Sequence, residues 1–187
     1  YKWSSFHDYN GKSKYPDILG NLEGGGNNAG LEGIAYSQGT NGQEQLFLAK
    51  ERQPAEIYLF EKNNSGSCVP IKKIEPKYED GLPIRDIGDL KIVDGQIFLL
   101  ARSARRIVQL DSNTGKEVKS WSFAKVEAKP VNQYLNKEWK YGTAEGLEVK
   151  KTSDGKYEFA IAWDNNREGT IENPDDKKGR ITFFYAE

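Results

Sequence analysis

Acidic and amide side chains recur at the ends of short apolar segments, and they are the groups in this sequence best suited to chemistry. The candidates are Glu32, Glu51, Asp86 or Asp89, Glu145, Asp164 and Asn165. Oxygen ligands without histidine or cysteine suit hard cations such as Ca²⁺ or Mg²⁺. We therefore predict a calcium site whose ligands are Glu32, Glu51, Asp89, Glu145, Asp164 and Asn165.

Other kinds of site are limited by the scarcity of two residue types. The chain has one histidine, His7, and one cysteine, Cys68. A Ser-His-Asp or Cys-His site would have to use His7, and a histidine-rich zinc site is excluded. Cys68 cannot form an internal disulfide, so cysteine usage leaves the cellular compartment open. Any chemistry must therefore run on carboxylates, amides, hydroxyls, lysine and arginine.

Carboxylates that converge repel one another and raise one another's pKa, so such a cluster needs a cation or basic side chains. A bound calcium ion is one solution. In a second, Glu32 and Glu145 accept backbone N–H groups and pair with nearby arginines, namely Arg52, Arg85, Arg102 or Arg105. In a third, a bound ion polarises a phosphoester, ester or lactone while Glu145 or Asp164 takes a proton, as in a metal-assisted hydrolase. The residue types leave these three roles open.

Length and charge narrow the class of protein. The chain has 187 residues and a mass of 21.1 kDa, which suits a single domain over residues 1–187. A formal net charge of -1 argues against a nucleic-acid partner. No apolar run reaches the ~20 residues of a membrane span, and no signal peptide is visible at Tyr1. Because the chain lacks methionine, we expect its natural N-terminus, with any targeting signal, to lie upstream.

Three stretches place apolar segments between short turns, which is typical of antiparallel strands. They span approximately residues 31–62, 84–123 and 143–187. The middle stretch contains four strands, and Asp94-Gly95 supplies one of its hairpin turns. A four-stranded meander is one blade of a β-propeller, so we predict an all-β fold with three recognisable blades and a partial one before Gly30. Residues 124–141 are the only segment that suits a short helix, which we expect around residues 132–139.

Aligning the three stretches brings their acidic ends into register. Residues 31–34 correspond to 145–147, with 84–90 in the same place in the middle stretch. The ends of the second strands also coincide, at residues 50–52, 102–105 and 164–166. The inner strands of a propeller surround a channel, so we expect these ends to meet although they lie far apart in the sequence.

The same residues resemble a known family. Residues 31–36, 49–58 and 89–111 are similar to the SdiA-regulated family of bacterial β-propellers, and 144–147 with 164–166 are similar to proteins described by the esterase-like activity of phytase. The resemblance extends over roughly residues 29–187. It implies a ring of five or six blades, so we expect either a fragment of a longer protein or a ring closed by assembly. It also implies a secreted, cell-envelope or periplasmic protein.

These observations give one expected function and two alternatives. The first is a calcium-binding propeller domain that binds a small-molecule or polymeric ligand at the mouth of its channel. The second is the metal-assisted hydrolase, with Glu145 and Asp164 as catalytic residues. The third is a structural propeller without metal, which binds a protein partner.

Overall fold

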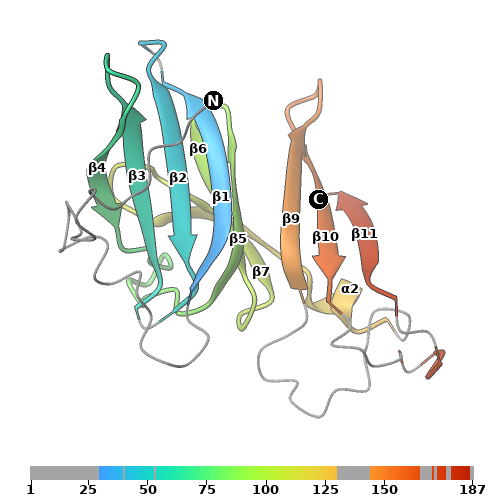
Figure 1. The fold of residues 1–187 in the computed structure, drawn as a ribbon. Helices are drawn as coiled ribbons and strands as arrows, with labels where there is room; N and C mark the ends of the chain where they lie inside the picture. The colour runs from blue at the N-terminus through green and yellow to red at the C-terminus, as the bar shows by residue number, and fades with distance from the viewer. Residues whose placement is uncertain are drawn as a thin grey trace.

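The computed structural model describes residues 30–39, 41–52, 54–129, 144–164, 170, 172–175 and 178–185. These residues form an all-β structure with a single short helix (Figure 1). Its strands are β1 (Leu31–Gln38), β2 (Glu44–Lys50), β3 (Glu56–Lys62), β4 (Cys68–Ile74), β5 (Ile87–Val93), β6 (Gln96–Ala101), β7 (Arg106–Leu110), β8 (Glu117–Ser122), β9 (Ala144–Lys151), β10 (Tyr157–Trp163) and β11 (Arg180–Tyr185). No helix in this described part of the chain is long and apolar enough to cross a membrane.

The strands form three antiparallel sheets in which neighbours in sequence are neighbours in space. The first sheet has the order β1-β2-β3-β4 and the second has the order β5-β6-β7-β8. The third sheet has the order β11-β10-β9, with three strands among the described residues. The predicted all-β fold of meander blades is confirmed, and the first blade reaches past residue 62 because β4 completes it.

Two apolar layers hold the sheets together face to face. Between the first and second sheets, Phe47 and Ile57 pack with Leu90 and Leu99, all buried. Between the second and third sheets, aromatic residues dominate, and the Trp121 ring lies 5.1 Å from that of Phe159. The middle sheet is therefore covered on both faces, which is why β6 consists almost entirely of buried apolar residues.

The inner strand of each sheet contains an irregularity close to its start. Pairing with the neighbouring strand skips Glu32 in β1, Gly88 in β5 and Glu145 in β9. A residue left out of the ladder in this way is a β-bulge, which bends the strand and redirects a side chain. β1 lies beside β5, and β5 lies beside β9, so the three bulges sit at neighbouring strand starts.

The described helix lies at the start of the segment 124–141 that the sequence marked as suited to one. α2 (Ala124–Glu127) directly follows β8, whereas the helix expected around residues 132–139 lies outside the described residues. Glu127 of this helix is buried and forms an ion pair with Arg105, which precedes β7. Burial raises the pKa of Glu127, and the charge and hydrogen bond of Arg105 partly offset that rise. This ion pair thus joins the helix to the turn between β6 and β7 of the second sheet.

Candidate functional site

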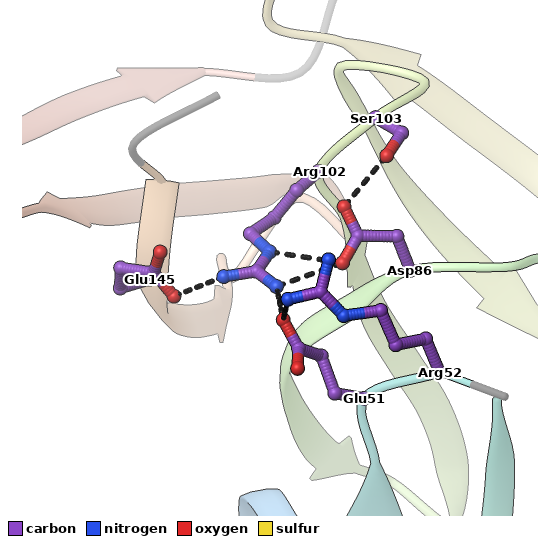
Figure 2. Close-up of polar contacts among 6 residues, drawn as sticks. All are labelled: Glu51, Arg52, Asp86, Arg102, Ser103 and Glu145. Atoms are coloured by element: carbon purple, nitrogen blue, oxygen red, sulfur yellow. Dashed lines mark hydrogen bonds and ion pairs between the residues drawn. The ribbon is translucent and has the colours of Figure 1, made fainter. Parts of the chain in front are cut away.

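The acidic strand ends meet around one guanidinium group, that of Arg102. Arg102 directly follows β6 and is 6% exposed. Its Nε and Nη2 atoms donate to Asp86 Oδ1 at 3.2 and 2.7 Å. Nη2 also donates to Glu51, and Nη1 donates to Glu145 (Figure 2). One side chain therefore binds three carboxylates.

These carboxylates come from all three sheets. Glu51 directly follows β2 of the first sheet, Asp86 directly precedes β5 of the second, and Glu145 lies in β9 of the third. A backbone bond supports the same junction, because the N–H of Ile87 donates to the carbonyl of Glu51 at 3.0 Å. Arg102 is thus the point at which the ends of the three sheets are tied together.

Two further side chains complete this group, which we call the Arg102 centre: Glu51, Arg52, Asp86, Arg102, Ser103 and Glu145 (Figure 2). The Ser103 hydroxyl donates to Asp86 Oδ2 at 2.6 Å, so both oxygens of that buried carboxylate are satisfied. Arg52 Nη2 lies 2.7 Å from Glu51 Oε1, the same oxygen that Arg102 binds. The planar guanidinium group, with five N–H donors, suits such multiple carboxylate contacts.

The strand register explains why an arginine stands in this place. Glu51, Arg102 and Asp164 each directly follow the second strand of their sheet, as the sequence alignment proposed. The bulge positions Glu32, Gly88 and Glu145 are likewise equivalent. The first and third sheets carry a carboxylate at both positions, whereas the second carries glycine and arginine.

Gly88 leaves the space that the Arg102 side chain occupies. A Cβ atom at Gly88 would lie 2.8 Å from Arg102 Cδ and 3.0 Å from the carbonyl oxygen of Ala144. Any side chain there would displace the arginine or β9. Glycine at the bulge position of the middle sheet is therefore the condition for placing the Arg102 guanidinium beside carboxylates of all three sheets.

The surroundings of Arg102 carry an excess of negative charge. Glu32, Glu51, Asp86, Glu145 and Asp164 interact with one another or with the two arginines, Arg52 and Arg102. Among these described side chains, carboxyl groups outnumber guanidinium groups by five to two. Burial raises the pKa of Glu32, and the charge of Glu51 adds to the rise.

Glu145 and Arg102 respond to the same environment. Burial raises the pKa of Glu145, and Arg102 only partly offsets it, while Glu32 and Asp164 raise it further. Burial alone would lower the pKa of Arg102, but the hydrogen bond to Asp86 and the charges of Glu145 and Asp86 raise it above its ordinary value. Arg102 thus stays charged, whereas the raised pKa of Glu145 favours its protonated form.

One buried carboxylate oxygen of the Arg102 centre lacks a hydrogen-bond donor among the described residues. Glu51 is 2% exposed, and its Oε2 atom has no hydrogen-bond partner in the structure described here. A buried carboxylate oxygen without a donor costs free energy. This oxygen marks the side of the Arg102 centre at which a further donor or cation would be accommodated.

The remaining predicted ligands lie elsewhere or outside the description. Asp89 accepts backbone N–H groups from Leu90 at 2.7 Å and Leu147 at 2.8 Å, and its carboxylate lies 3.3 Å from Lys91. Asp89 therefore links the second and third sheets away from the Arg102 contacts. Asn165 is not among the described residues.

The proposed calcium ligands do not form a ready metal cage among the described residues. Within that part of the chain, no three side chains of histidine, cysteine, aspartate or glutamate are grouped to hold an ion. The Arg102 guanidinium lies between Glu51, Asp86 and Glu145, where an ion would otherwise have to sit (Figure 2). The sequence pointed to Glu32, Glu51 and Glu145, and its arginine-pairing alternative is confirmed for Glu145 and Arg102. It did not predict that Arg102 binds three carboxylates, nor the parts played by Ser103 and Gly88. The one available signal was the glycine at the position where the other two stretches carry glutamate.

Comparison with known proteins gives a family. No curated protein matches the chain. Among solved structures, the glutaminyl cyclase of Myxococcus xanthus aligns over 86% of this chain and 75% of its own, at 14% identity and a TM-score of 0.43. The profile of the SdiA-regulated family matches residues 18–136, more than half of the sequence. The chain therefore belongs to the SdiA-regulated family.

Proposed function

We propose that this chain is a non-catalytic binding domain whose acidic strand ends are held together by Arg102 in place of a metal ion. The observation that carries the proposal is the set of bonds from one buried guanidinium group to Glu51, Asp86 and Glu145. Each carboxylate belongs to a different sheet, so the positively charged arginine bridges the three sheets as a bound metal ion would.

The hydrogen bonds and ion pairs of these carboxylates favour a structural role over catalysis. A general base needs a free lone pair within reach of its substrate. Asp86 has both oxygens bound, and Glu145, the expected proton acceptor, is paired with Arg102. The hydrolase alternative would require Glu145 to leave this pair. We therefore assign Glu145 to binding and not to proton transfer.

The same charges indicate what the domain binds. The excess of carboxylates around Arg102 produces a negative potential at the strand ends, which attracts positively charged groups. A small-molecule or polymeric ligand with a cationic group, or a basic segment of a protein partner, fits this potential. The half-buried Glu145 is the position that such a group would approach, because Glu51 and Asp86 are buried.

Calcium binding is a second candidate function, and one specific observation favours it. Glu51 Oε2 is buried without a donor in the described structure, and Glu32, Glu145 and Asp164 add negative charge nearby. An ion bound beside Arg102, using these oxygens, would relieve both features. This arrangement requires Arg102 to share the site or to move.

Calorimetric titration with Ca²⁺ distinguishes the two candidates. We expect no binding heat, and no change of melting temperature between EDTA and Ca²⁺, because the Arg102 guanidinium already occupies the space between Glu51, Asp86 and Glu145. The experiment is repeated on Glu51→Gln and on Glu79→Gln, a matched exposed carboxylate in the turn after Tyr78. Saturable binding that Glu51→Gln abolishes and Glu79→Gln retains would establish the calcium site and overturn the proposal.

A further inference from the structure

The turn that carries Arg102 contains a strained residue. β6 and β7 pair up to Ala101 and Arg106, so residues 102–105 form the turn between them. Arg105, the last residue of this turn, has a φ of 53°. That value lies in the left-handed region, which glycine adopts readily but which costs an arginine free energy. Contacts beyond local preference must therefore hold Arg105 in this conformation.

The conformation of the turn decides where Arg102 and Ser103 lie. The ladder between β6 and β7 ends at Ala101, so strand pairing fixes neither of these two residues. The N–H of Arg105 donates to the carbonyl of Arg102 at 2.8 Å and closes the turn. The side chain of Arg102 has little room, because a Cβ atom at Gly88 would already lie 2.8 Å from its Cδ. A change of backbone conformation at Arg105 would therefore displace the Arg102 guanidinium from its carboxylates.

Contacts from outside the turn hold Arg105 in place. Its carbonyl accepts a hydrogen bond from the N–H of Phe123 at 2.9 Å, directly before α2. Its Nε forms the ion pair with Glu127 of α2. Glu127 is 6% exposed, whereas the Arg105 side chain is 44% exposed, so the buried partner fixes the more mobile one. A buried carboxylate needs a positively charged partner, which ties Arg105 to the helix.

We infer that Glu127 is a positioning residue for the Arg102 centre, which it reaches through Arg105. The ion pair holds Arg105 in its left-handed conformation, and this conformation fixes the turn. The turn in turn places Arg102 and Ser103 against Asp86 (Figure 2). Backbone strain persists where the surrounding structure over-determines a conformation, and it clusters at functional sites. The inference rests on the function proposed above, because it assigns a further residue to the same site.

Hydrogen exchange of the Arg102 Nε–H, followed by NMR, tests the inference. This group donates to Asp86 Oδ1 at 3.2 Å, so its exchange rate reports whether the guanidinium is in place. The backbone N–H of Leu99 is the internal reference, because Leu99 lies in the middle of β6 and its strand is paired on both sides. A variant that merely lowers the stability of the fold accelerates exchange at Leu99. A displaced turn accelerates exchange at Arg102 and leaves Leu99 unchanged.

Glu127→Met removes the carboxylate and suits a buried position in a helix. The strain then released at Arg105 is of the order that changes a population tenfold, so the Arg102 Nε–H should exchange at least about tenfold faster relative to Leu99. Adding Arg105→Gly is expected to restore the wild-type ratio, because glycine adopts a positive φ without the ion pair. Lys125→Met, at an exposed position of the same helix, is the matched control and should leave the ratio unchanged.

Near-ultraviolet circular dichroism establishes that each variant retains the packed aromatic core. If Glu127→Met does not fold, Arg105→Gln breaks the same ion pair at its more exposed member, and Arg105→Gly is compared with it directly. The inference alone is overturned by an unchanged ratio in Glu127→Met, by a change that Arg105→Gly does not reverse, or by an equal change in Lys125→Met. A wild-type Arg102 Nε–H that exchanges as fast as that of the exposed Arg85 overturns the proposed function as well.

Discussion

Arg102 shows how a single residue decides the chemistry of a site that the surrounding carboxylates would otherwise define. Glu51 and Asp86 are buried, and a buried carboxylate is tolerated only when it is paired and hydrogen-bonded. Replacement of such an ion cluster by apolar residues is often neutral, so its value lies more in specifying one arrangement than in total stability. Removal of only one partner is strongly destabilising, because it leaves the other charges buried without a counter-charge.

Glu32 allows a test of the electrostatic description through pH. Partial loss of contact with water, and then the charge of Glu51, raise the pKa of the largely exposed Glu32 above its ordinary value of 4.5, so the folded protein holds this proton more tightly than the unfolded chain. Its stabilising contribution is complete below the ordinary pKa and is lost as the pH rises through the raised value. Glu32→Gln should therefore increase stability at neutral pH relative to acidic pH.

The measurement is the free energy of unfolding in urea at several pH values between acidic and neutral. The gain at neutral pH is expected to stay below about 1 kcal/mol, because Glu32 is exposed and solvent screens its charge. Glu79→Gln, in an exposed turn, provides the baseline. A Glu32→Gln curve that parallels the wild type at every pH would contradict the assignment of Glu32 to this acidic cluster.

For single residues, the sequence predicted the carboxylates and named Arg102 among four possible arginine partners, but it did not single Arg102 out. Residue types and repeated spacing were sufficient to select Glu32, Glu51 and Glu145. The bonds from Arg102 to Asp86, Glu145 and Glu51 span 16, 43 and 51 positions, so they depend on how the sheets stack. Asp89 illustrates the same limit, because a bulge at Gly88 directs its carboxylate to the N–H of Leu147.

Among the elements, the bulged inner strands position the site. Each bulge interrupts the ladder at the strand start, which brings Glu32 and Glu145 to the ends where the second strands finish. Close approach between inner strands requires a small residue next to the first bulge. A Cβ atom at Gly33 would lie 2.8 Å from the backbone nitrogen of Leu90 and 3.2 Å from the backbone of Asp89.

Gly33→Ala tests this packing of β1 against β5. The added methyl group meets backbone atoms, which cannot move aside as a flexible side chain could, so we expect a loss of about 1–3 kcal/mol in the free energy of unfolding. Gly30→Ala is the control, because a Cβ atom there has nothing within 4 Å. Equal stability of the two variants in urea would show that β1 and β5 are not in close contact.

Most strands could be predicted from the sequence because alternation and glycine turns are local signals. Asp94 and Gly95, with φ of 50° and 73°, form the predicted hairpin turn between β5 and β6. β4 was not assigned to the first blade, since Pro70 and alternating lysines weaken its strand pattern. β4 is held as a strand by its pairing with β3 and not by the strand preference of its own residues. A shift in register between the two strands accommodates Pro70.

In the molecule as a whole, the described sheets form a stack in which the middle sheet is shared by two apolar layers. The blade architecture and the SdiA-regulated family were both predictable from repeated motifs. The number of blades in a complete ring stays a prediction, since it depends on contacts beyond these sheets. The Arg102 centre is the one polar junction in the described structure to which all three sheets contribute, so it couples the stability of the sheets.

Urea unfolding of Arg102→Gln tests this central claim most directly. The substitution leaves Glu51 and Asp86 buried without their guanidinium partner, so the account predicts a loss of about 3–5 kcal/mol in the free energy of unfolding. Arg85→Gln, at the exposed neighbour of Asp86, is predicted to change it by less than about 0.5 kcal/mol. Equal stability of Arg102→Gln and Arg85→Gln would contradict the claim that Arg102 holds the three sheets together.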